Sequence, residues 1–446
     1  MCLRKMKNRK SLKNKISGAF DFTFVELCFI IIMLYVTLVL WNSQSDPHFT
    51  KNQEKPKKKQ ETKKQRKYLN CTRNPTIIYW SQDNLNTDVL GTIECEELCD
   101  VYWTNQKLML PRNSEGAYLF YGSRTNFANM PLPRNPQKVI WAFQHEESPK
   151  NVLHFMHEKI LNLFNYSSTF SRHSDVPYPL HYMISLKLIT STKYFVKTEA
   201  KNRALKEIAP ILYIQSSCKA PTQRDEYVKE LMNYQRIDSY GACLNNKPIP
   251  NHLKEINSNY LNNLYAENFL KFMARYKFVL TIENGLCDDY ISEKFWRAIH
   301  VGVVPIYFGA PTIRDWLPNN KSALILDDFP SPLRLSARIN TLMRDDDLYE
   351  EYLQHKTKAL ISNQKIIEEI KARPYQTDDM QKDKKFMCFI CKKLYQKDKS
   401  IKVVPKSHYN CPKPKPIFAD SDITWAQLWE TSRKESEEIY DEIMYF

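Results

Sequence analysis

Short apolar runs separated by polar turns characterise the part of the chain that follows residue 70. Residues 76–80, 117–122 and 138–143 are rich in β-branched and aromatic side chains, which is typical of buried strands. The turns rely on Pro, Asn, Asp and Ser, because the chain contains 24 Pro but only 8 Gly. The first half of the body is therefore predicted to be built on buried strands.

The second half alternates apolar strands with amphipathic helices. The expected strands are residues 211–218, 236–241, 277–284, 303–309 and 322–329, and the expected helices are residues 224–235 and 289–302. This alternation predicts an α/β fold in which helices wrap a parallel sheet. Such sheets bind ligands beyond the carboxyl ends of their strands, which places residues 283–290 at a ligand site. A long helical stretch follows residue 330.

The N-terminal region has the pattern of a membrane anchor. Residues 22–41 form an apolar run of 20 residues, about the length that crosses a bilayer, and seven Lys/Arg lie in the first 15 residues. The positive flank predicts a cytosolic N-terminus and a lumenal body. A cleaved signal peptide is the alternative, but "LYVTLVLWNSQ" offers no good small-residue cleavage site. We expect a cytosolic tail at 1–21, a transmembrane helix at 22–41 and a polar stem at 42–70.

The positive charge of the chain is concentrated in this N-terminal region. The formal net charge is +15, but residues 1–70 hold 16 Lys/Arg against 5 Asp/Glu, which leaves only +4 for the remaining residues. The body has neither a basic stripe nor a nucleic-acid-binding motif. We therefore predict that it does not bind nucleic acid.

Cysteines and sequons agree with a secretory compartment. Nine of the eleven cysteines follow the apolar run, as do sequons at Asn70, Asn165 and Asn320. The C-x-x-C at Cys388–Cys391 could be a redox or zinc motif. The chain has no second C-x-x-C and no nearby His pair, so structural disulfides are the better interpretation.

The stretch "TIENGLCDDYISEKFWRA" at residues 281–298 packs four carboxylates around Lys294. If residues 289–302 form a helix, Asp288 and Asp289 lie at its N-terminus, where short carboxylates cap free amides. A lysine in the first helical turn opposes the helix dipole at a cost of about 0.3–1 kcal/mol. Either Lys294 is simply solvated, or an anion shares the site.

A second cation lies on the same predicted edge of the sheet. Arg224 starts the helix that follows the strand at 211–218. An arginine and a lysine that converge on helix N-termini can bind a diphosphate without a glycine loop. The chain contains neither G-x-x-x-x-G-K nor G-x-G-x-x-G, which argues against P-loop and dinucleotide sites. A nucleotide-sugar donor fits the secretory anchor better.

A third charged group follows a strand of the first half. His145, Glu146 and Glu147 follow residues 138–143 after a single intervening residue, Gln144. Glutamates after strands are commonly surface residues. The functional alternative is a general base that faces the donor across an interdomain cleft.

At these residues the chain resembles the α-1,3-fucosyltransferase family, and most closely its ten/eleven branch, regarded as GDP-fucose protein O-fucosyltransferases. The likeness extends from about Thr76 to Cys411. Its most specific motifs are "ENGLCDDYISEKFW" and "GVVPIYFGAP", and independent matches are "HEESPKN", "LFNYSSTFSRHSD" and "IDSYGAC".

The resemblance implies a GT-B-type α/β fold, in which two Rossmann-like domains face each other across a cleft. It implies an acceptor-side domain at 71–195, a GDP-fucose-binding domain at 196–370 and a C-terminal cysteine-bearing tail at 371–446. No metal or other cofactor is expected beside the donor GDP-fucose.

The resemblance also assigns roles to individual residues. Glu147 matches the family's base, and Arg224 and Lys294 match residues that hold the diphosphate. Further donor-side matches are Tyr240, Asn284, Tyr290 and Glu293, and acceptor-side positions are His145 and Arg172. The implied disulfides are Cys95–Cys388 and Cys99–Cys391, with Cys218–Cys243 as a further pair and Cys71 as a candidate unpaired cysteine.

The implied reaction is inverting transfer of L-fucose from GDP-β-L-fucose, in α linkage, to a hydroxyl of a glycoprotein acceptor. The favoured acceptor is Ser/Thr of a cysteine-rich, EMI-like domain, and the alternative is GlcNAc of an N-glycan. A membrane-tethered binding protein on a retired transferase fold is the alternative of another class. Blood-group-type members carry Ser-Asn instead of Ser217-Cys218 and lack the extra His145-Glu146 pair. These differences bear on which acceptor is used and not on the donor chemistry. We expect a type II protein of the endoplasmic reticulum or Golgi membrane.

Overall fold

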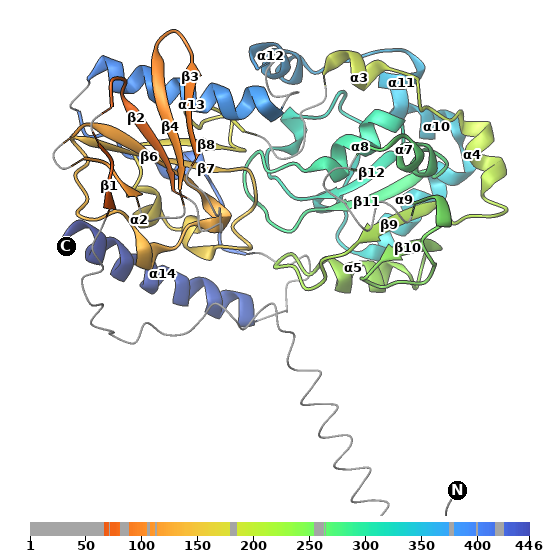
Figure 1. Ribbon diagram of the computed structural model, residues 1–446. Coiled ribbons are helices and arrows are strands. Elements are labelled where there is room, and N and C mark those ends of the chain that lie inside the picture. Colours follow the sequence, from red (N-terminus) through yellow and green to blue (C-terminus); the bar gives the residue numbers. More distant parts are fainter. Residues whose placement is uncertain are drawn as a thin grey trace, which may run out of the picture. The chain divides into compact units, whose positions relative to one another are not determined.

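Two β-sheets, one mixed and one parallel, form the core of the chain in the computed structural model (Figure 1). The structure describes residues 67–446, apart from residues 71, 81–88, 105–107, 112–113, 179–184, 254–262, 264, 374–378, 398–399 and 415–422. The predicted cytosolic tail, the anchor and nearly all of the stem lie outside the described residues and stay predictions. Within the described part of the chain, we find no helix with the length and apolar character needed to span a bilayer.

The first sheet has six strands in the order β3-β4-β2-β6-β7-β8. The strands are β2 (Thr76–Trp80), β3 (Val89–Glu94), β4 (Leu98–Thr104), β6 (Gly116–Tyr121), β7 (Val139–His145) and β8 (Tyr166–Thr169). All pairs are parallel except β3 with β4, which form an antiparallel hairpin at one edge. A separate small parallel pair joins β1 (Lys67–Tyr68) to β5 (Leu108–Met109).

The second sheet has five parallel strands in the order β10-β9-β11-β12-β13. The strands are β9 (Ile211–Gln215), β10 (Ile237–Gly241), β11 (Phe278–Ile282), β12 (Val304–Phe308) and β13 (Leu324–Ile325). Every residue of β11 and β12 is buried, as expected for strands with helices on both faces. The strand expected at 322–329 is wrong in extent, because a 3-10 turn replaces it from Leu326 onward.

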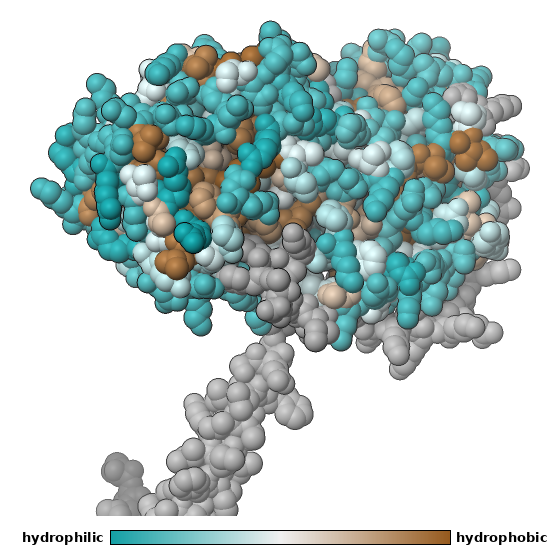
Figure 2. Space-filling model, turned by 180° about the vertical axis from the view of Figure 1, so that it is seen from behind, coloured by the Kyte–Doolittle hydropathy of each residue, from teal (hydrophilic) through white to brown (hydrophobic). Residues whose placement is uncertain are grey.

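Helices surround both sheets. They are α2 (Glu158–Leu161), α3 (Leu186–Thr190), α4 (Thr198–Ala204), α5 (Arg224–Leu231), α7 (Glu267–Ala274), α8 (Glu293–Val301), α9 (Pro332–Arg344), α10 (Asp346–Glu350), α11 (Gln354–Thr357), α12 (Gln364–Ala372), α13 (Asp379–Gln396) and α14 (Ile423–Met444). On the face seen in Figure 2, hydrophilic residues predominate and hydrophobic residues occur in small groups.

Helices of the C-terminal tail pack against the first sheet. Helix α13 packs Phe386 and Ile390 with Ile77 and its neighbours in one core, whereas Ile443 of α14 joins Ile78 in another. Because successive strand residues point to opposite faces, these two cores lie on opposite faces of the sheet. The tail predicted at 371–446 therefore covers both faces of the first sheet.

Four disulfides lie among the described residues. Three are the expected pairs Cys95–Cys388, Cys99–Cys391 and Cys218–Cys243. The first two attach the β3–β4 hairpin to α13. The fourth, Cys287–Cys411, was not anticipated and joins the segment before α8 to the tail.

The helix predicted at 289–302 begins later than expected. Helix α8 starts at Glu293, after Ser292, whose hydroxyl accepts a hydrogen bond from the Lys294 amide. Asp289 has a left-handed backbone with φ of 63°, which an α-helix does not accommodate. The helix ends as expected at Gly302, which has φ of 68°, a conformation that glycine adopts without steric cost.

Candidate active site

The carboxyl end of β7 meets the carboxyl end of β11. Ser148 follows β7 and donates a hydrogen bond of 2.9 Å from its Oγ to Oδ1 of Asn284, which follows β11. A small pocket at this junction is lined by residues of both halves, including Lys150, Thr222 and Gly285. The strand ends that the sequence placed at a ligand site are thus brought together from the two sheets.

Glu147 lies at this junction. Its Oε2 is 3.5 Å from the hydroxyl of Tyr290, in the segment between β11 and α8. Burial and the neighbouring Glu146 raise the pKa of Glu147 to about 7, although Lys294 counteracts them. A carboxylate with a pKa near neutrality is suited to accept a proton.

The acidic residues around Lys294 perform different tasks. Glu283 is fully buried and accepts hydrogen bonds of 2.8 Å from the amide and from the hydroxyl of Ser292. The Lys294 Nζ lies 3.6 Å from Glu283 and 3.3 Å from Glu293. Burial raises the pKa of Glu283, whereas Lys294 lowers it. The turn therefore holds the lysine with two carboxylates, and Glu283 is a site residue that our sequence analysis did not assign.

Arg224 is the first residue of α5 and is only 1% exposed. Its guanidinium donates to the carbonyl of Ile282, at 3.3 Å, and to the carbonyl of Ser217. Its buried Nε has no hydrogen-bond partner among the described residues. Arg224 therefore joins the ends of β9 and β11 and retains a donor that no described residue satisfies.

A third cation comes from the first half of the chain. Lys150 donates a hydrogen bond of 2.7 Å from Nζ to the Ser217 Oγ, on the residue whose carbonyl binds Arg224. Burial lowers the pKa of Lys150, and the positive charges of Arg224 and Lys294 lower it further. Our sequence analysis missed Lys150, although it lies three residues after Glu147 in "HEESPKN".

Asp288 and Asp289 do not cap α8, so that prediction is wrong. The Asp289 carboxylate accepts hydrogen bonds from Arg172, at 2.7 Å, and from the Trp316 indole, at 2.9 Å. Burial would raise the pKa of Asp289, but its bonds to Arg172 hold it below its usual value. Asp288 instead accepts a hydrogen bond of 2.6 Å from Asn410 in the tail.

Two predicted acceptor-side residues are occupied by internal contacts. Arg172 also pairs with Asp315, at 3.1 Å, and stacks over the Trp316 ring. His145 is fully buried, and burial lowers its pKa to about 3. In this arrangement Arg172 joins the two halves and His145 is inside the protein, and contact of either side chain with an acceptor stays a prediction.

Of the other residues predicted to bind the donor, three lie at the junction of the two sheets and one does not. Asn284, Tyr290 and Glu293 lie in the junction described above. The Tyr240 hydroxyl instead lies 3.2 Å from the Tyr276 hydroxyl in a buried core. A role for Tyr240 near the nucleoside stays a prediction.

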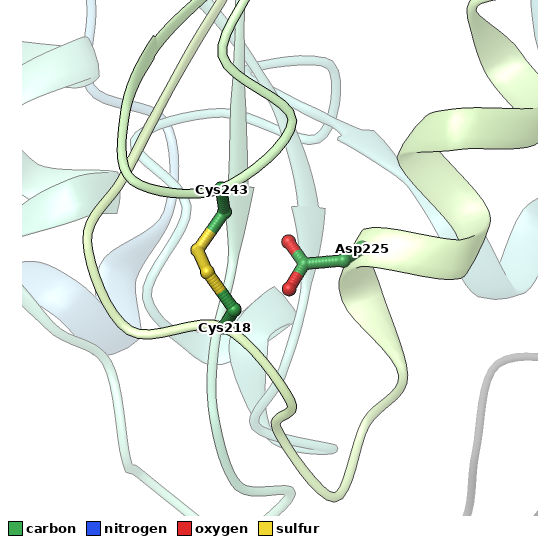
Figure 3. Close-up of side chains that lie close together, drawn as sticks. All are labelled: Cys218, Asp225 and Cys243. Carbon is green, nitrogen blue, oxygen red and sulfur yellow. A yellow bond between two sulfur atoms is a disulfide. The ribbon is translucent and has the colours of Figure 1, made fainter. Parts of the chain in front are cut away.

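Cys218, Cys243 and Asp225 lie close enough to suggest a metal site (Figure 3). The two sulfurs are bonded to each other, so neither is a thiolate that could ligate an ion. The Asp225 carboxylate accepts a hydrogen bond of 2.6 Å from the Tyr213 hydroxyl. We therefore interpret these residues as structural, a disulfide beside a hydrogen-bonded carboxylate near the start of α5.

The sequons differ in accessibility. Asn70 and Asn320 are exposed. Asn165 is 6% exposed, and its amide donates to the Lys402 carbonyl at 3.1 Å while its oxygen accepts from Arg134 and Trp141. In this fold the Asn165 side chain is buried and hydrogen-bonded within the core, and glycosylation at Asn165 stays a prediction.

A buried general-base candidate beside Lys294, with Lys150 and Arg224 at the same junction of two α/β sheets, is the arrangement expected of a glycosyltransferase that uses a nucleotide-activated sugar. Residues 72–181 match the domain described as "Fucosyltransferase, N-terminal" and residues 204–409 match "Glycosyltransferase family 10 (fucosyltransferase) C-term". The chain belongs to glycosyltransferase family 10, the fucosyltransferases.

Curated relatives agree with this assignment. The chain is 39% identical over 387 residues to human GDP-fucose protein O-fucosyltransferase 3, a match that covers 81% of this chain and 78% of that protein. The Danio rerio protein of the same name is 36% identical over 376 residues, which covers 81% and 80%. A solved α1,3-fucosyltransferase with GDP-fucose is 18% identical, covering 60% of this chain and 80% of that one, with a TM-score of 0.37.

Proposed function

We propose that this fucosyltransferase transfers fucose from GDP-fucose to a hydroxyl of a protein acceptor, with inversion at the sugar. The observation that carries the proposal is the position of Glu147, a carboxylate with a pKa of about 7, within the field of Lys294. The curated relatives named above, which are protein O-fucosyltransferases, support the choice of donor and acceptor class.

In the proposed reaction, Glu147 removes the proton of the acceptor hydroxyl as its oxygen attacks C1 of fucose from the face opposite GDP. The new C1–O bond forms while the bond from C1 to the diphosphate breaks, and the electron pair leaves with GDP. A single displacement converts the β-linked donor into an α-linked product.

Negative charge develops on the diphosphate as the sugar leaves. Lys150 donates to the Ser217 hydroxyl, the Ser217 carbonyl accepts from Arg224, and Lys150 lies within the electrostatic field of Arg224 and Lys294. Fixed cations in a partly buried site stabilise such charge without solvent reorganisation. We propose that these cations perform this task and that the enzyme requires no metal ion.

The acceptor can be tested with labelled GDP-fucose and the full chain. We expect label on Ser/Thr of a folded, secreted cysteine-rich domain and little label on the same domain after reduction and alkylation. Label confined to GlcNAc of an N-glycan would support that alternative acceptor instead. A chain that neither transfers fucose nor releases GDP from GDP-fucose would be a binding protein, and the proposal would be wrong.

The proposed base predicts an acid limb in the pH profile. Burial and Glu146 raise the pKa of Glu147 to about 7, and only the deprotonated carboxylate can accept a proton. The kcat/KM for the acceptor should therefore rise up to about pH 7 and fall roughly tenfold per unit below it. GDP binding measured at the same pH values provides the control. A rate independent of pH between about 5.5 and 8.5 would contradict Glu147 as the base.

The proposed compartment is the lumen of the secretory pathway, with the body tethered by residues 22–41. The four disulfides among the described residues support an oxidising compartment, and the apolar length of residues 22–41 supports the tether.

A further inference from the structure

The C-terminal segment Val404–Cys411 contacts the backbone of the candidate base. Its Val404 amide donates to the Phe164 carbonyl at 2.9 Å, and Asn410 binds Asp288 through both its side chain and its backbone. Cys411 is bonded to Cys287. The segment is thus attached both to the first sheet and to the segment that precedes α8.

Tyr409, the residue before Asn410, contacts the base segment through its hydroxyl. The hydroxyl donates a hydrogen bond of 2.6 Å to the carbonyl oxygen of Glu147 and lies 2.7 Å from Nδ1 of His145. Its ring is 1% exposed and stacks on the His145 ring at 5.6 Å between centroids.

The positions of the protons along this group follow from counting donors. The single Tyr409 proton goes to Glu147, so Nδ1 of His145 must carry a proton and donate it to the Tyr409 oxygen. Nε2 of His145 is then an acceptor, and it lies 2.8 Å from the Ser123 hydroxyl, which donates to it. Burial keeps His145 neutral. In the series of hydrogen bonds Ser123–His145–Tyr409–Glu147, each residue therefore donates to the one named after it.

We infer that Tyr409 is a positioning residue for the base, because its hydroxyl holds the carbonyl of Glu147 in the loop after β7, next to the anchor of Ser148 on Asn284. This inference rests on the proposed role of Glu147. The side chain of Glu147 lies 3.5 Å from the Tyr290 hydroxyl, and its carbonyl accepts the hydrogen bond from Tyr409. A misplacement of about 1 Å at a reacting group can lower a rate by about 10².

The variant Tyr409→Phe removes the hydroxyl and retains the stacked ring. It leaves the Glu147 carbonyl and Nδ1 of His145 without their partner. We expect kcat to fall by about 10–100-fold while GDP affinity changes less than about twofold, since the cations are untouched.

The control is Tyr349→Phe, which removes an equally buried hydroxyl that donates to the Lys277 carbonyl at 2.8 Å in the second half. Both variants should lose thermal stability, but only Tyr409→Phe should lose kcat. Equal kcat values in the two variants, at the level of the unaltered enzyme, would overturn the inference.

Ser123→Ala provides a test if Tyr409→Phe fails to fold. It removes the donor to Nε2 of His145, so the imidazole can change tautomer and take the Tyr409 proton away from Glu147. We expect a several-fold loss of kcat with GDP affinity unchanged, and an unchanged kcat would overturn the inference. If Glu147→Gln retains turnover, the proposed function fails as well. If Glu147→Gln is inactive while Tyr409→Phe and Ser123→Ala turn over normally, only the positioning role fails.

Discussion

Replacement of Glu147 by Gln is expected to lower kcat by about 10²–10⁴ while GDP binding is retained, because the amide has the shape of the carboxylate but accepts no proton. GDP should bind at least as tightly as before, since the variant removes a negative charge from the field of Lys294. Single-turnover transfer and calorimetric titration with GDP measure the two effects separately.

The same variant has a predictable effect on stability. The pKa of Glu147 is raised from 4.5 to about 7 in the folded chain, so the folded state favours its protonated form. That contribution to stability is present below the unfolded pKa and is lost as the pH rises through about 7. Glu147→Gln has no carboxyl group to ionise, so its stability does not fall in this way as the pH rises. At about pH 8, its thermal midpoint should therefore be at least that of the unaltered chain.

Glu158→Gln is the matched control, because Glu158 is exposed in the first turn of α2 in the same half. It should change neither kcat nor GDP affinity. Turnover by Glu147→Gln equal to that of Glu158→Gln would remove Glu147 from the reaction.

Replacement of Lys294 by Ala is expected to weaken GDP binding by about 10–100-fold, the value of one charge-assisted hydrogen bond of about 1.5–3 kcal/mol. Guanosine, which lacks the diphosphate, should bind equally to both proteins. A comparison of the two ligands therefore separates loss of a phosphate contact from general damage to the site. Lys150→Ala should give the same pattern with a smaller effect, because its Nζ is attached to Ser217 rather than to α8.

The control for general damage is Lys271→Ala, on the exposed side of α7 in the same half, where the lysine pairs with Glu267 at 2.7 Å. It should leave GDP affinity unchanged. Equal loss of affinity for guanosine and GDP in Lys294→Ala would indicate a structural effect through the buried Glu283.

Measurement of activity with and without a chelator tests the proposed independence from metal, since a chelator should not alter the activity of the unaltered enzyme.

Much of the architecture can be predicted because it depends on local patterns. The alternation of short apolar strands with helices is reproduced by β9, α5, β11, α8 and β12 within a few residues. Strand burial and helix amphipathicity repeat over two to four residues, so they are visible along the chain itself. Strand position alone favoured a surface role for Glu147, and it was the family resemblance that assigned Glu147 and Lys294 to one site.

The errors occur where a partner lies far away in sequence. Asp289 looked like a helix cap until its partner Arg172, more than a hundred residues earlier, was brought against it. Asn165 lies in a sequon, and the structure shows that its amide also donates to the carbonyl of Lys402, 237 residues later in the chain. No local pattern contains these pairs, since they form only when distant segments pack together.

By itself, the sequence determined the strands, most of the helices, the family motifs and the residue types that the donor site requires. Only the tertiary structure decided which acids hold Lys294, that Lys150 joins Arg224 on Ser217, and that Tyr409 in the tail supports the peptide of Glu147. The physical reason is range: backbone periodicity and turn preference act over a few residues, whereas burial and hydrogen-bond partners are set by packing across the whole fold.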